Sequence, residues 1–188
     1  MKIPFFSRIM SLSAIQRQST LSLFFTILIT VTGFFSTMLF SHILGKDLMG
    51  VYYLFLAYYG IFNMIGDGGF GQAAVKRISE GKEQNEYLTA YACLRGLLIV
   101  VSTVILLTIS PFFIDLQEYN IVPCIIITLV AAAFGHTISM GVYGLGHVGI
   151  YNIGFGLSEL ARIIVQIGTV LLGYSVYGLI GGYIAGII

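Results

Sequence analysis

Residues 18–45 read QSTLSLFFTILITVTGFFSTMLFSHILG and contain no Asp, Glu, Lys or Arg in 28 positions. A helix needs about 20 apolar residues to cross the ~30 Å hydrocarbon core of a bilayer. The whole chain of 188 residues shares this character, because 57% of its residues are hydrophobic and only 9% are charged, against roughly 25% charged in a soluble domain. So few charges cannot solvate a globule of this size, which excludes a soluble enzyme, a nucleic-acid-binding protein and a disordered chain. The composition predicts an integral membrane protein.

Long charge-free stretches recur along the chain. The longest, residues 119–158, has 40 positions, which is too long for one crossing. We divide it in two, because Pro123 is typical of the first turn of a helix and three glycines between positions 144 and 149 interrupt its middle. Alternation with period two is absent, which favours helices over the strands of a barrel. The sequence therefore predicts an all-α protein with spans at about 21–43, 51–71, 88–112, 121–143, 150–172 and 177–188.

The sixth stretch is short, with only 12 residues from position 177 to Ile188. A helix that ended halfway across a bilayer would leave carbonyl groups unpaired in hydrocarbon, at a cost of several kcal/mol each. We therefore expect the chain to be truncated at Ile188 and to be a fragment of a longer protein.

Lysine and arginine near the ends of the spans predict the orientation. Most of them lie in two places, the N-terminal tail (Lys2, Arg8 and Arg17) and the second connection with the start of the third span (Lys76, Arg77, Lys82 and Arg95). The first connection carries only Lys46, and the connection at 115–118 carries none. We expect the N-terminus and the segment 76–87 to lie in the cytoplasm, in a multi-pass protein of the plasma membrane.

Two opposite charges lie inside the fifth predicted span, Glu159 and Arg162. Each costs about 2.5–3.5 kcal/mol at mid-bilayer, so each should face protein or water and have a partner. Their spacing places them on one face of the helix, and that face is extended by Asn152, Gly156, Gln166 and Thr169. We interpret the stripe as the lining of a substrate cavity. The alternative is an ion pair that only holds helices together.

The second predicted span ends in residues 66–71, GDGGFG, which formally match G-x-G-x-x-G. A dinucleotide site needs a preceding strand and a βαβ unit, whereas apolar crossings lie on both sides here. We interpret the segment as a glycine-rich helix end in which Asp67 lies close to Arg77 or Arg95. Asn63 continues the face of Asp67 by one turn, and both are candidates to line the cavity, unless Asp67 is only a salt-bridged carboxylate.

Three further features have simpler interpretations. Gly178, Gly182 and Gly186 form a tandem G-x-x-x-G stripe that predicts close packing on a neighbouring helix. His136 lies inside the fourth span, where it is either a hydrogen-bonding residue between helices or part of a proton relay. Cys93 and Cys124 fall at opposite ends of the membrane, too far apart for a disulfide.

Nothing in the sequence has the pattern of an enzyme. No His, Cys, Asp or Glu cluster has metal-ligand spacing, and every connection between spans is under about fifteen residues, too short for an aqueous domain. We expect no catalytic residues, no metal and no cofactor.

Two blocks resemble a known family. Residues 44–53 read LGKDLMGVYY and residues 67–77 read DGGFGQAAVKR. Their letters are similar, in order and in position at the span ends, to a pattern near the N-terminus of polysaccharide-biosynthesis flippases of the Wzx type. These belong to the larger superfamily of multidrug-and-toxin exporters, oligosaccharidyl-lipid flippases and polysaccharide exporters. Asp67 matches the acidic position of that pattern, whereas Glu159 and Arg162 match no motif of the family.

The resemblance implies a transporter of twelve to fourteen helices in two six-helix lobes, of which this chain would be the N-terminal one and would need its C-terminal lobe as a partner. The cavity between the lobes would carry the head group of a lipid-linked oligosaccharide to the outer leaflet by alternating access while the lipid tail stays in the membrane. The lipid-linked oligosaccharide includes a diphosphate, which is anionic, so an arginine in the cavity would bind it. We expect Arg162 in this role, with Arg77 and Arg95 as lesser candidates at the inner mouth.

Two other functions remain open. An ion-coupled multidrug exporter with the same fold would have a net negative cavity for its cations. A membrane-embedded glycan polymerase or ligase would need a large outer loop with Arg, His or Asp groups. Neither alternative involves nucleic acid.

Overall fold

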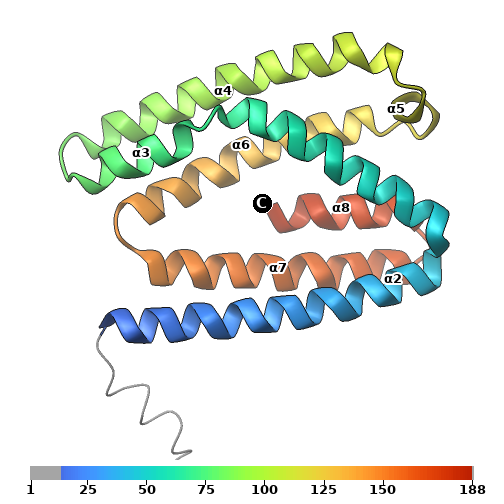
Figure 1. The fold of residues 1–188 in the computed structure, drawn as a ribbon, viewed down its shortest axis with the longest axis horizontal. Coiled ribbons are helices and arrows are strands. Elements are labelled where there is room, and N and C mark those ends of the chain that lie inside the picture. Colours follow the sequence, from blue (N-terminus) through green and yellow to red (C-terminus); the bar gives the residue numbers. More distant parts are fainter. Residues whose placement is uncertain (1–13, 188) are drawn as a thin grey trace, which may run out of the picture.

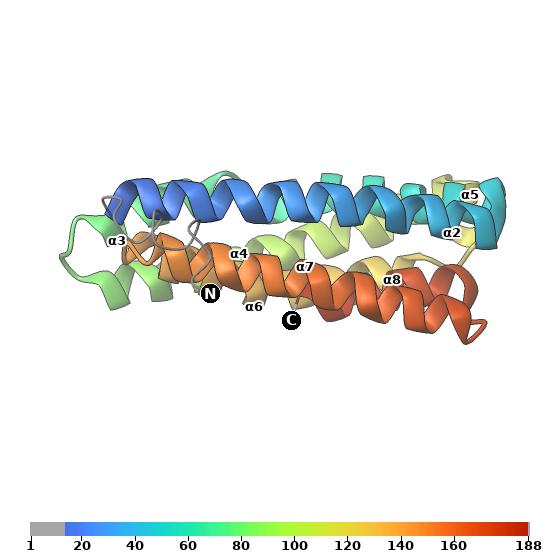
Figure 2. The ribbon, with the colours of Figure 1, turned by 90° about the horizontal axis from the view of Figure 1, so that it is seen from below.

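The computed structural model describes residues 14–187, and it is helical throughout, with no strand among those residues. Four helical segments are long and apolar enough to cross a membrane, Leu23–Asp67, Gln84–Phe112, Val122–Gly144 and Val148–Leu171. The shorter helix α8 (Ser175–Ile187) is also apolar. Together these helices give the chain the character of a multi-pass membrane protein, as its composition predicts. The helices lie side by side along the long axis of the molecule (Figure 2).

The first two predicted spans lie in the segment α2 (Ala14–Asp67), in which two helices meet at the non-helical residue Gly45. Gly45 has φ 78° and ψ 171°, a backbone conformation that residues other than glycine rarely adopt. At this point the chain reverses, so that the leg 46–67 runs back across the molecule at an angle to the leg 14–44 (Figure 1). The structure therefore has two helices here, as the sequence predicts, joined at Gly45.

The predicted helix end at residue 71 is wrong. Helix α2 ends at Asp67, because Gly68 and Gly69 both have positive φ, 56° and 78°, and the next helix, α3 (Phe70–Ser79), begins directly after them. Helix α3 buries Gly71, Ala74 and Ile78 and packs against α4 and α6. The first residues of the predicted cytoplasmic segment, 76–79, therefore belong to an amphipathic helix.

The remaining helices follow in order. Helix α4 (Gln84–Ile109) continues into the short 3₁₀ helix η1 (Ser110–Phe112) and is followed by α5 (Ile114–Glu118), α6 (Val122–Gly144), α7 (Val148–Leu171) and α8. Both cysteines are free, Cys93 on α4 and Cys124 in the first turn of α6.

The core lies between the second leg of α2 and helices α4, α6 and α8. Its fully buried side chains include Phe55, Leu106, Leu129 and Leu179. The first leg of α2, in contrast, exposes large apolar side chains such as Phe34 and Met38, which are 66% and 64% exposed. This apolar exterior fits a hydrocarbon environment rather than water.

Candidate functional site

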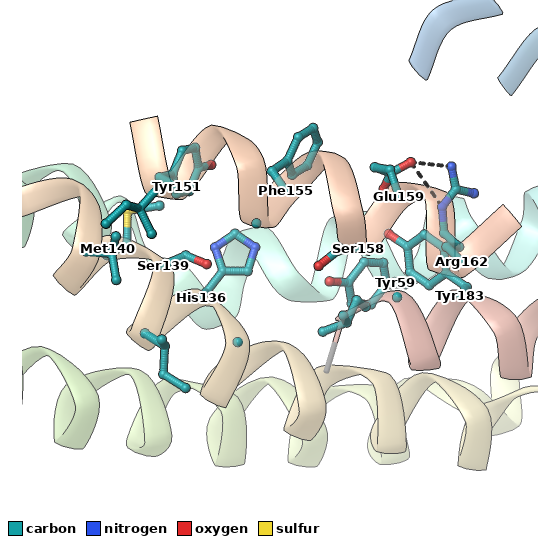
Figure 3. A pocket seen from close by; sticks show the side chains of 17 residues that line it. Tyr59, His136, Ser139, Met140, Tyr151, Phe155, Ser158, Glu159, Arg162 and Tyr183 are labelled. Carbon is teal, nitrogen blue, oxygen red and sulfur yellow. Dashed lines mark hydrogen bonds and ion pairs between the residues drawn. The ribbon is translucent and has the colours of Figure 1, made fainter. Parts of the chain in front are cut away.

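Two neighbouring cavities open on the side of α6. The larger, about 410 Å³, lies between α6 and α7 and is closed by Tyr59 of α2 and Tyr183 of α8. The smaller, about 320 Å³, lies at the end of α2 and the start of α3. His136 and Met140 of α6 line both cavities. The two cavities therefore share one wall, which Figure 3 shows from the side of the larger.

Glu159 and Arg162 line the larger cavity as an ion pair on α7. Arg162 donates from Nη2 and Nε to the same carboxylate oxygen, Oε2 of Glu159, at 2.5 and 3.1 Å. The guanidinium lies 6.0 Å from the centre of the Tyr183 ring, within the range of a cation–π contact. Both side chains are 21% exposed. Each charge thus has a partner and borders the cavity (Figure 3).

Helix α8 holds Arg162 in place through its glycine stripe. A Cβ atom at Gly186 would lie 2.6 Å from Cβ of Arg162, and one at Gly178 would lie 2.9 Å from Cβ of Thr169. At Gly182 the added atom would lie 2.9 Å from the backbone nitrogen of Gln166. The close packing predicted from the G-x-x-x-G pattern is confirmed, and its partner is α7.

The polar stripe predicted on α7 divides between several neighbours. Gln166 is 1% exposed and donates to the Tyr52 hydroxyl at 3.0 Å and to the Leu179 carbonyl at 2.8 Å. Its amide oxygen accepts from Nη1 of Arg162 at 3.4 Å, a long contact. Gly156 packs on Phe25 of the first leg of α2. Gln166 therefore joins helices, and it is not among the residues that line either cavity.

Asn152 is half-buried and is likewise absent from the lining of both cavities. The face of α7 that does line the larger cavity carries Tyr151, Gly154, Phe155 and Ser158 beside Glu159 and Arg162. The sequence analysis missed these residues and His136 as lining groups. On α7 the available signal was two rows of four-residue steps, 151–155–159 and 154–158–162, but an aromatic stripe alone does not distinguish a cavity from lipid.

A second ion pair, Asp67 with Arg95, joins α2 to α4. Nη1 of Arg95 lies 2.5 Å from Oδ1 of Asp67, Nη2 donates to the Asn63 amide oxygen at 3.1 Å, and the Tyr91 hydroxyl donates to the same carboxylate at 2.9 Å. Arg95 is 1% exposed and Asp67 31%. Asp67 and Asn63 line the smaller cavity, and Arg95 is buried beside them.

Arg77, the other predicted partner of Asp67, pairs instead with Glu80 at 3.2 Å on the surface of α3, where its side chain is 59% exposed. It lines neither cavity. Of the two predicted partners, Arg95 pairs with Asp67 and Arg77 does not. The chain changes direction at Gly68 and Gly69, so that Arg77 lies on α3 away from Asp67.

The two cavities have little net charge. The larger contains one acid and one base, bound to each other, and the smaller contains Asp67, whose charge is balanced by Arg95. The other lining groups are aromatic rings, hydroxyls and an imidazole. Within residues 14–187 no group of three His, Cys, Asp or Glu side chains is placed to hold a metal. The arrangement suits a polar ligand that carries both hydrogen-bonding and apolar surface.

Comparison with known proteins finds a partial match. A segment of 67 residues, 36% of this chain, is 43% identical to the "Probable low-salt glycan biosynthesis flippase Agl15" of Haloferax volcanii. The matched segment makes up 14% of the length of that protein. No family model matches the chain, and no solved structure matches it. The chain is thus a helical membrane protein with a partial likeness to a glycan flippase.

Proposed function

We propose that this chain is the N-terminal lobe of a transporter that moves a lipid-linked oligosaccharide from the cytoplasmic to the outer leaflet by alternating access. The observation that carries the proposal is the ion pair of Glu159 and Arg162 on the wall of a 410 Å³ cavity between apolar helices. Charges inside a membrane-spanning helix are tolerated where they face a partner or water. The partial likeness to a glycan flippase supplies the substrate class.

In this proposal six spans with a cytoplasmic N-terminus form one lobe, and a second lobe completes the cavity. Arg162 contacts the diphosphate of the substrate, with Glu159 as the counter-ion that holds the guanidinium when the cavity is empty. A diphosphate is a good partner because guanidinium binds phosphate oxygens in pairs. Asp67, Asn63 and Arg95 form the second polar wall, whereas Arg77 is paired with Glu80 on the surface and lines neither cavity.

The charge of the cavity favours a glycan flippase over an exporter of cations. A cation exporter needs unpaired carboxylates, whereas Glu159 is held by Arg162 and Asp67 by Arg95. A membrane-embedded polymerase or ligase needs a large outer loop, and the connections between the described helices are short, such as 145–147 and 172–174. We therefore favour a transporter over an enzyme as the function of this protein.

The direct test is Arg162→Ala in the protein as the cell makes it. We expect glycan export to fall at least about tenfold, because the variant removes the anion ligand and leaves Glu159 without its partner. Arg77→Ala is the matched control, since this arginine is paired on the surface with Glu80, and it should export normally.

Export is measured with a lipid-linked glycan in reconstituted vesicles, beside a cationic dye. Normal glycan export by folded Arg162→Ala protein would remove Arg162 from the mechanism. Transport of the dye without transport of the glycan would establish the cation exporter instead.

A further inference from the structure

Two aromatic side chains of α7, Tyr151 and Phe155, line one wall of the larger cavity. Tyr151 and Phe155 lie one helical turn apart on α7, and their rings are stacked with centroids 6.5 Å apart and planes 11° apart. Gly154 lies between them on the lined face. We call Tyr151, Gly154 and Phe155 the aromatic shelf. Helix α6 contributes His136 and Ser139 to the lining of the same cavity (Figure 3).

The space beside the shelf is empty. A Cβ atom at Gly154 would meet no atom within 4 Å, whereas one at Gly156, two residues along the same helix, would lie 2.6 Å from the Phe25 ring. Phe155 is 53% exposed although it lines the cavity. The glycine therefore leaves room for a ligand between the two aromatic residues, and it is not needed there for helix packing.

The groups around the shelf match a sugar ring. A pyranose has C–H bonds on one face and hydroxyls around its edge. The C–H bonds carry partial positive charge and are attracted to the negative face of an aromatic ring, while His136, Ser139 and Ser158 can donate to or accept from the hydroxyls. The formally charged side chains of this cavity, Glu159 and Arg162, are bound to each other. The shelf thus offers stacking and hydrogen bonds but no unpaired charge.

We propose that the aromatic shelf binds an uncharged sugar ring of the transported glycan, stacked on Tyr151 and Phe155. This inference rests on the proposed function, because it assumes that the cargo is a glycan. It adds that the sugar is recognised beside, and separately from, the anionic group at Arg162.

The test fills the shelf without disturbing the fold. Gly154→Leu places a side chain in the empty space, and Gly168→Leu is the matched control, since Gly168 is on the same helix and also has no atom within 4 Å of an added Cβ. The full chain is placed in lipid nanodiscs, and saturation-transfer NMR measures binding of the methyl glycosides of glucose, galactose, mannose and N-acetylglucosamine. We expect at least one glycoside to bind, and Gly154→Leu to lower its signal at least fivefold while Gly168→Leu leaves it unchanged.

A second variant, Tyr151→Leu with Phe155→Leu, should lower the signal similarly. No signal from any of the four glycosides with folded protein overturns the proposal, as does equal binding by Gly154→Leu and Gly168→Leu. A failure of the proposed function looks different: wild-type protein would not move a lipid-linked glycan in vesicles, while glycoside binding at the shelf would persist.

Discussion

Arg95 carries the largest fully buried side chain among the described residues. Its guanidinium is held by Asp67, Asn63 and the Tyr91 hydroxyl, and its Nε atom has no hydrogen-bond partner within the described part of the chain. A buried guanidinium that loses its carboxylate keeps its charge, because arginine does not deprotonate in proteins. The buried pair Asp67–Arg95, which joins α2 to α4, and the exposed pair Arg77–Glu80 at the end of α3 therefore differ greatly in what their removal costs.

We predict that Asp67→Ala destabilises the protein by about 3–5 kcal/mol, the usual cost of breaking a buried pair from one side. Glu80→Ala, which removes the exposed partner of Arg77, should cost about 1 kcal/mol or less. Both are measured as the midpoint of unfolding when sodium dodecyl sulfate is titrated into detergent-solubilised protein. Equal midpoints for the two variants would show that Arg95 has water or another anion available when Asp67 is absent.

At the scale of elements, the contact of α7 with α8 is the most extensive among the described helices. Two adjacent glycines of α8 have opposite surroundings: an added Cβ at Gly182 would lie 2.9 Å from the backbone nitrogen of Gln166, and one at Gly181 would meet no atom within 4 Å. Backbone cannot move aside as a flexible side chain can, so these two positions should respond differently to the same methyl group.

We predict that Gly182→Ala destabilises the protein by about 1–3 kcal/mol through overpacking. Gly181→Ala should be neutral or stabilising by up to about 1 kcal/mol, because alanine favours the helix. The same detergent titration compares them. A stable Gly182→Ala variant would mean that α8 can slide along α7 and that the position of Arg162 does not depend on it.

The elements show what the sequence could and could not predict. Charge-free length gives a helix wherever hydrocarbon must be crossed, which is why α6 and α7 lie where the sequence predicts them. The end of α2 was misplaced because Gly68 and Gly69 change the chain direction through backbone conformation, which hydropathy does not record. The predicted cavity-lining face of α7 also differs from the observed one. Gln166 donates a hydrogen bond to α8 and Gly156 packs on Phe25, and these tertiary contacts cannot be read from the sequence.

For the whole molecule, the central claim is that an ionic couple inside apolar helices is tolerated because its side of α7 borders water. Ser158 lies on that side, among the residues lining the cavity. Ile164, on the same helix, is 69% exposed and lies outside the lining of both cavities, as a lipid-facing residue would. The two residues therefore test which side of α7 is in contact with water and which is in contact with lipid.

The most direct measurement is labelling of single cysteines at these two positions, in protein where Cys93 and Cys124 are replaced by serine. A water-soluble maleimide reacts with thiolate, which forms only in contact with water. The account predicts that Ser158→Cys in native membranes is labelled at least tenfold faster than Ile164→Cys. Equal rates, or faster labelling at Ile164→Cys, would place Glu159 and Arg162 against lipid and contradict the account.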